Sequence, residues 1–326
     1  MEISQPESAV SGVLRQAAPP IKPQSRVSIS IVFALGITIF SWASAFAGIR
    51  AALSGYSPAH LALLRYLIAS LVLAVYAAAR RMPLPDWRDL PGLAFTGFVG
   101  IALYNLALNT GEISTSAGVS SFLVNTAPII TAFLATMFLK ERLLVWGWLG
   151  ILLCITGVAI IAFNTGQEMR LSTGALYVLV AALAQSLYFV LQKPYLARYT
   201  ALQCTSYAVW SGTLVLLFFS RGLVGDLKTA SLSATLAAGY LGIFPAALGY
   251  VTWAYTLARI PAARAASFLY LVPAVTLGIA WFWLGKWPTW LALLGGAVAI
   301  SGVVIVNLFG KNNSHAKTQR RKELTD

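Results

Sequence analysis

The stretch SSFLVNTAPIITAFLATMFLKERLLVWGWLGILLCITGVAII, residues 120–161, occurs twice in this chain in altered form. The second copy, ASFLYLVPAVTLGIAWFWLGKWPTWLALLGGAVAISGVVIV, covers residues 266–306. Prolines and glycines stay aligned at an offset of 145 residues: Pro128 with Pro273, Gly150 with Gly295, and Gly157 with Gly302. Similarity among apolar helices that arises by chance rarely keeps these residues in register. The chain is therefore built from two copies of one unit.

The composition indicates that water is not the main solvent of this chain. Hydrophobic residues make up 58% of it and charged residues only 10%, whereas soluble domains have about 25% charged residues. A span-length window finds ten apolar stretches that could each cross a bilayer as a helix: 29–52, 58–79, 90–110, 114–139, 145–164, 173–195, 202–220, 232–257, 261–284 and 288–309. They lack the alternation of membrane barrel strands. We predict an all-α polytopic membrane protein of ten transmembrane helices.

Each copy of the repeat holds five spans, and an odd number forces the second copy to enter the membrane upside down. This inverted topology is typical of secondary transporters, whose substrate site lies near the midplane between the halves. We expect four parts: a Pro-rich disordered cytoplasmic tail (1–28), two five-helix repeats around a central cavity (29–164 and 173–309), and a basic cytoplasmic tail (310–326). No cleavable signal peptide precedes the first span, which should itself target the chain.

The distribution of Lys and Arg predicts the orientation. With the N-terminus in the cytoplasm, most of the 23 Lys and Arg residues fall on the inner side, as the positive-inside rule requires. Arg221 and Lys228 are exceptions that this count does not explain. Both termini are expected inside a cell (inner or plasma) membrane. The net charge of +13 then follows from topology and not from a nucleic-acid partner, while anionic-lipid binding by the tails and a homodimer stay open.

Several motifs resemble the EamA-type members of the drug/metabolite transporter superfamily: FSWASAFAG (40–48), LALLRYLIASL (61–71), PIITAFLATMFLKERL (128–143) and ITGVAII (155–161), with their counterparts in the second half. The resemblance covers residues 29–309. It implies two inverted bundles around a central cavity that move small metabolites, often amino acids, outward across the membrane. The chain departs from the pattern where Gly285-Lys286 replaces the Lys140-Glu141 pair of the first repeat.

Arg65 is the one charge between Ser57 and Arg80. It lies about 10 Å into its helix, close to the middle of a hydrocarbon core about 30 Å thick. A central Arg costs about 2.5–3.5 kcal/mol in lipid, so we expect it to face the bundle interior. Either its guanidinium binds a substrate carboxylate or phosphate, for which Arg is better suited than Lys, or it reaches the interface or braces helix ends.

Other polar groups fall within spans and either join helices or line a path for the substrate. With Arg65, the candidate substrate-binding residues are Trp42, Tyr104, Asn125, Gln185, Tyr188, Tyr250, Trp253 and Tyr270. Aromatic walls suit flat or ammonium-bearing ligands. Pro128 and Pro273 interrupt equivalent spans and are candidates for helix breaks with a gating role, or for plain structural kinks. The aligned glycines are assigned to close helix contacts, with a dimer face open.

Energy coupling requires a group that titrates, and the sequence offers few. We expect no acidic residue deep in a span, so facilitated export or exchange is favoured over proton-coupled antiport. Glu112, near a predicted mouth, is either a proton or salt-bridge site or an ordinary loop carboxylate. A channel stays open, although no charge ring or carbonyl-lined loop is evident. Cys154 and Cys204 are isolated, so we expect no metal, no cofactor and no enzymatic activity.

Overall fold

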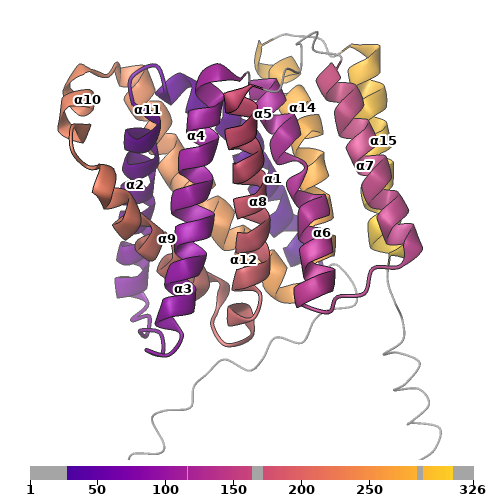
Figure 1. Cartoon of the computed structure of the whole chain (residues 1–326), viewed down its shortest axis with the longest axis horizontal. Coiled ribbons are helices and arrows are strands. Elements are labelled where there is room, and N and C mark those ends of the chain that lie inside the picture. The colour runs from indigo at the N-terminus through magenta and orange to yellow at the C-terminus, as the bar shows by residue number, and fades with distance from the viewer. Residues whose placement is uncertain (1–27, 116, 164–171, 285–288, 311–326) are drawn as a thin grey trace, which may run out of the picture.

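The computed structural model describes residues 28–115, 117–163, 172–284 and 289–310, and nearly all of that backbone is helical (Figure 1). The first half of the chain forms α1 (Ile29–Ala52), α2 (Pro58–Ala79), α3 (Leu90–Gly97), η1 (Phe98–Leu103), α4 (Tyr104–Ser114), α5 (Ala117–Val124), α6 (Ala127–Phe138) and α7 (Val145–Phe163). The second half forms α8 (Thr173–Gln192), η2 (Tyr195–Ala197), α9 (Ala201–Leu216), η3 (Leu217–Phe219), α10 (Leu223–Thr229), α11 (Leu232–Leu241), η4 (Gly242–Gly249), α12 (Tyr250–Arg259), α13 (Ala262–Ser267), η5 (Phe268–Leu271), α14 (Val272–Leu284) and α15 (Trp290–Phe309).

Nine helices in the described residues are long and apolar enough to cross a membrane, and a shorter apolar helix, Ala262–Thr276, lies at the ninth predicted position. The all-α polytopic fold is confirmed. The third span, Leu90–Ser114, runs about one turn beyond the expected end at residue 110. Glu112 lies beyond the apolar window found in the sequence, but it is buried in the structure, so the helix continues.

The last helices of the two repeats, α7 and α15, pack against each other in antiparallel directions. The backbone N–H of Leu144, just before α7, donates to the carbonyl of Gly310, just after α15 (3.4 Å). A Cβ built on the aligned glycines would meet a carbonyl oxygen in two equivalent contacts: Gly157 with Gly295 at 2.5 Å, and Gly302 with Gly150 at 2.6 Å. Each contact becomes the other under the repeat offset, as a two-fold axis requires. The repeats therefore run in opposite directions, and these glycines serve contacts within the chain.

An equivalent contact occurs within each repeat, at the ends of other helices. In each repeat one cation donates to two carbonyls at a helix C-terminus: Arg50 to Glu112 (3.4 Å) and Thr115 (2.8 Å), and Lys193 to Leu257 and Ile260. The first pair of acceptors maps onto the second at the offset of 145 residues that aligns the repeats. Cations suit these positions because the last carbonyls of a helix lack intrahelical partners.

The third and eighth spans both contain a π-helical segment in their middle. These segments are η1 and η4, and each is followed directly by a tyrosine, Tyr104 or Tyr250. A π-helical turn widens the helix and displaces the residues beside it, which is common at functional sites. Pro245 lies inside η4. The two segments thus modify equivalent spans at the depth where the repeats meet.

The outer surface of the bundle is apolar. Large hydrophobic side chains are exposed on the helices, among them Phe33 on α1, Leu71 on α2, Phe133 on α6 and Leu214 on α9. Exposed apolar surface of this extent is unusual for a protein in water and fits contact with the hydrocarbon core of a bilayer.

Candidate substrate-binding pocket

A cavity lies between the two repeats. It contains about 590 Å³ of space up to its open mouth, and its wall is formed by Trp42, Ala45, Phe46, Ile49, Arg65, Tyr104, Leu108, Val124, Asn125, Pro128, Gln185, Pro245, Tyr250, Leu269 and Val272. These residues come from α1, α2, α4 and the α5–α6 junction of the first repeat and from α8, η4, α12 and the η5–α14 segment of the second. The mainly apolar wall with few polar groups is typical of small-molecule sites.

Arg65 contributes the charge on this wall. It belongs to the buried stripe of α2, where inward residues such as Ala62, Ala69 and Leu73 recur three or four positions apart. Its side chain is 3% exposed, so it does not reach a lipid interface. Its Nε and Nη1 atoms have no hydrogen-bond partner in the described part of the chain. The guanidinium carbon lies 5.5 Å from the ring centre of Tyr66. Bracing of helix ends is therefore not its role here.

Two amide side chains, Asn125 and Gln185, line the cavity. Asn125 lies in the break between α5 and α6, and its Nδ2 donates to the carbonyl of Ser121 (2.7 Å). That bond uses one donor of the amide, and Asn125 still lines the pocket. Pro128 is the second residue of α6, where its missing N–H is tolerated. Gln185 reaches the cavity from α8. The break in the fourth span thus exposes an amide to the cavity.

Aromatic rings form a continuous cluster beside the guanidinium group of Arg65. Trp42 contacts Tyr250 edge-on, with ring centres 5.5 Å apart, and its Nε1 donates to the carbonyl of Pro245 (3.3 Å). The hydroxyl of Tyr250 donates to the carbonyl of Gly100 in η1 (3.3 Å). These bonds link α1 and both π-helical segments around the cavity, so the ring positions depend on how the two repeats dock.

A family model described as the EamA-like transporter family matches the chain twice, over residues 29–163 and 172–308. The chain belongs to this family. The protein named uncharacterized transporter YdfC, from Bacillus subtilis, is 41% identical over 302 residues, or 91% of this chain and 99% of that protein. A probable terminal-alkyne amino-acid exporter of Streptantibioticus cattleyicolor is 43% identical over 277 residues, or 85% of this chain and 93% of that protein. A solved crystal structure, 16% identical, has the same fold with a TM-score of 0.71 and covers 87% of this chain and 98% of its own.

Six of the candidate side chains of this EamA-like transporter meet at the pocket: Trp42, Arg65, Tyr104, Asn125, Gln185 and Tyr250. Three others do not line it. Tyr188 packs on Tyr250 and Trp253 packs on Phe189, and Tyr270 lies in a separate apolar cluster with Ile151 and Cys154. In helices that are apolar all round, the sequence pattern does not show which face points to a cavity and which to a neighbouring helix.

The two candidate prolines occupy equivalent places in the EamA-like fold. Pro128 begins α6 after a break, and Pro273 begins α14 after the η5 turn. Pro128 lines the pocket directly, whereas for Pro273 it is the preceding residue, Val272, that does so. Both spans are thus interrupted beside the cavity. The pair Gly285-Lys286, where the second repeat departs from the first, lies outside the described residues.

Sequence reasoning missed two features of the site. Pro245 lines the pocket from inside η4, and a proline within a predicted span was the available signal. Glu112 was favoured as a loop carboxylate, yet it is 1% exposed and lies in the last turn of α4, so the preference for a loop position was wrong. It is two residues from the end of the third span, so the expectation that no acidic residue lies deep in a span is not contradicted. The sequence offered little indication that Glu112 is helical and buried, because its polar neighbours made the end of the third span look like a loop.

The described residues contain no group of three or more His, Cys, Asp or Glu that could hold a metal ion. Cys154 and Cys204 are buried and free. The pocket offers one guanidinium, two amides and aromatic hydroxyls, which can bind and orient a solute. Such a set fits the binding of a solute in a family of transporters.

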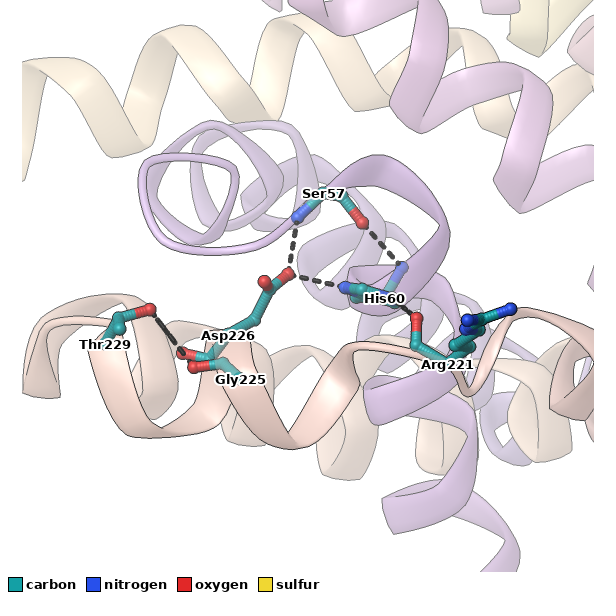
Figure 2. Close-up of polar contacts among 6 residues, drawn as sticks. All are labelled: Ser57, His60, Arg221, Gly225, Asp226 and Thr229. Atoms are coloured by element: carbon teal, nitrogen blue, oxygen red, sulfur yellow. Dashed lines mark hydrogen bonds and ion pairs between the residues drawn. The ribbon is translucent and has the colours of Figure 1, made fainter.

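A polar contact outside the pocket ties the two repeats together (Figure 2). The Asp226 carboxylate in α10 lies 2.5 Å from Nδ1 of His60 at the start of α2, and it accepts the backbone N–H of Ser57 (3.2 Å). The other ring nitrogen of His60 lies 3.0 Å from the carbonyl of Arg221. The hydrogen bond with His60 lowers the pKa of Asp226 below its ordinary value. Arg221, unexplained by the charge distribution, thus takes part through its backbone.

Proposed function

We propose that this EamA-like transporter exports a small amino acid or a related carboxylate-bearing metabolite by alternating access around the pocket. The observation that carries this proposal is Arg65, a buried guanidinium with two unpartnered nitrogens on the wall of a cavity between inverted repeats. A carboxylate satisfies such a fork with two parallel hydrogen bonds. The relative named as an amino-acid exporter supports amino acids as the first class to test.

The remaining wall would hold the organic part of the solute. Trp42, Phe46 and Tyr104 offer apolar and aromatic surface beside Arg65. This surface favours a solute with a short apolar side chain over one with a charged side chain. The interruptions before Pro128 and Pro273 would let each repeat bend where it faces the cavity. Rocking of one repeat against the other would then open the site to the two sides in turn.

We further propose facilitated transport or exchange, in a cell (inner or plasma) membrane with both termini in the cytoplasm. The positive-inside distribution of Lys and Arg supports this orientation. Reporter fusions at residue 326, read out in intact cells, test it. A C-terminal reporter active only outside the cytoplasm would contradict the orientation.

The transport proposal is tested with the full chain in proteoliposomes. Labelled L-norvaline is added outside, vesicles contain unlabelled amino acids from a panel, and counterflow is measured with and without a pH gradient. We expect saturable uptake that counter-substrate stimulates. R65Q should reduce it about ten-fold or more, because a charge-assisted contact contributes about 1.5–3 kcal/mol. R88Q, which removes an exposed Arg outside the pocket, should leave it unchanged.

Three results would contradict the proposal in different ways. Undiminished counterflow in a folded R65Q variant would remove Arg65 from the site. Single-channel current without counterflow would indicate a pore. Uptake that requires a pH gradient would indicate proton-coupled antiport instead of exchange.

A further inference from the structure

Glu112 is a buried carboxyl group near the pocket, on a helix that packs against the helix of Arg65. Its residue is 1% exposed, and neither carboxylate oxygen has a hydrogen-bond partner in the described part of the chain. A buried carboxylate without a partner is costly, so such a group calls for an explanation. A cationic group that donates hydrogen bonds would satisfy it.

The position of Glu112 on α4 directs its side chain toward the pocket. Tyr104, Leu108 and Glu112 are spaced four residues apart and share one face of the helix. Tyr104 and Leu108 line the pocket, and Glu112 is one turn further along. Side chains on a helix lean toward its N-terminus, so the carboxylate leans toward Leu108 and the end of the cavity.

Arg65 leans toward Glu112 from the facing helix. Two hydrogen bonds show that α2 and α4 run in opposite directions: Asn105 Nδ2 to the hydroxyl of Tyr66 (2.9 Å), and Asn109 Nδ2 to the carbonyl of Pro58 (3.0 Å). Each side chain leans toward the start of its own helix. On antiparallel neighbours these directions converge, so the two side chains lean toward each other: Arg65 lines the cavity, and Glu112 lies one turn beyond the lining residue Leu108.

The other nearby cation, Arg50, hydrogen-bonds to the backbone at the end of α4. Arg50 donates through Nη1 to the backbone carbonyls of Glu112 and Thr115, where it caps the end of α4. It does not hydrogen-bond to the carboxylate oxygens of Glu112. All charge at the cavity comes from the first repeat, since the lining residues of the second repeat are neutral. Arg65 and Glu112 are thus a base and an acid on neighbouring helices, and the Nε and Nη1 atoms of Arg65 and both carboxyl oxygens of Glu112 lack hydrogen-bond partners in the described residues.

We propose that Glu112 is a specificity-determining residue that binds the ammonium group of the amino acid whose carboxylate is held by Arg65. This inference rests on the proposed function and narrows its substrate class to zwitterions. An α-amino acid presents both charges, and its ammonium group supplies three donors to a carboxylate that otherwise has none. A solute without the ammonium group leaves Glu112 unpaired and binds more weakly.

The experiment measures affinities of the purified full chain by isothermal titration calorimetry. Three ligands share one carbon skeleton: L-norvaline carries both charges, valerate lacks the amino group, and butylamine lacks the carboxylate. For the wild-type protein we expect norvaline to bind at least ten-fold more tightly than either analogue. E112Q should abolish the preference of norvaline over valerate, and R65Q should abolish the preference over butylamine.

Matched variants separate this role from loss of structure. E112D keeps the charge and should restore part of the norvaline preference, while D86N removes an exposed carboxylate far from the cavity and should change nothing. If E112Q does not fold, the comparison of valerate with norvaline on the wild-type protein still tests the proposal. Equal wild-type affinities would overturn it.

Three further outcomes overturn the inference. A folded E112Q variant that keeps the wild-type preference for norvaline over valerate would do so. If transport by this variant also no longer responded to a pH gradient, Glu112 would be a proton carrier. Binding of valerate without binding of norvaline would refute the role of Glu112 and leave carboxylate export standing. Binding of neither would refute the proposed function and this inference together.

Discussion

Replacement of Gly157 by Ala tests the contact between α7 and α15, which holds the inverted repeats together. An added Cβ would lie 2.4 Å from the backbone nitrogen of Ala299 and 2.5 Å from the carbonyl oxygen of Gly295. Normal contact begins near 3.4 Å, so the two backbones would have to separate by about 1 Å. Neither atom belongs to a flexible side chain that could turn away.

The expected cost follows from two opposing effects. Overpacking of this kind costs about 1–3 kcal/mol, while exchange of Gly for Ala inside a helix gains about 0.5–1 kcal/mol. G157A should therefore destabilise the protein by roughly 0.5–2 kcal/mol. The matched control is Gly36 in α1, where an added Cβ would meet nothing within 4 Å, so G36A should gain the helix term alone.

The assay is thermal unfolding of the purified protein in detergent, followed by intrinsic fluorescence. We expect opposite signs: a lower Tm for G157A and a slightly higher Tm for G36A. The double variant G157A/G295A should cost less than the sum of the single variants, because one separation of the helices relieves both contacts. A G157A protein as stable as G36A would refute the reasoning that backbone contact at these glycines holds the repeats together.

Other predictions concern the ends of the bundle. The Glu141 carboxylate accepts the backbone N–H groups of Ala262 (2.8 Å) and Ala263 at the start of α13, so E141A should lower the free energy of unfolding by about 1.5–3 kcal/mol, measured as a fall in Tm; no fall would exclude this cap. K193M should lower Tm by a similar amount through the freed carbonyls of α12; a Tm equal to that of the wild type would contradict it. The depressed pKa of Asp226 means that its contact stabilises above the ordinary carboxyl pKa near 4 and is lost on acidification. The Tm difference between wild type and D226N should thus shrink below about pH 4, and a difference independent of pH would count against this contact.

The sequence identified many of the residue types at the site, but not which side of each helix faces the cavity. A charge, two amides and several aromatic residues inside apolar spans marked Arg65, Asn125, Gln185 and their neighbours as candidates. The sequence did not separate Tyr250, which lines the cavity, from Tyr188, which packs behind it. Amphipathic periodicity normally gives that separation, but helices surrounded by lipid and by other helices are apolar on every side. The sequence also did not show that Glu112 is buried, since burial depends on how other helices pack around α4.

The sequence by itself determined the all-helical membrane class and the presence of two inverted repeats. Span length and hydropathy are local properties, and five spans in each copy leave one choice of direction for the second. Only the tertiary structure decided which helix faces meet. The reciprocal packing of Gly150 and Gly157 on α15, and the placement of Arg65, Asn125 and Gln185 on the wall of one cavity, depend on helices that are distant in the sequence or separated by a whole repeat. Such contacts follow from how helices dock, which no local pattern of residues specifies.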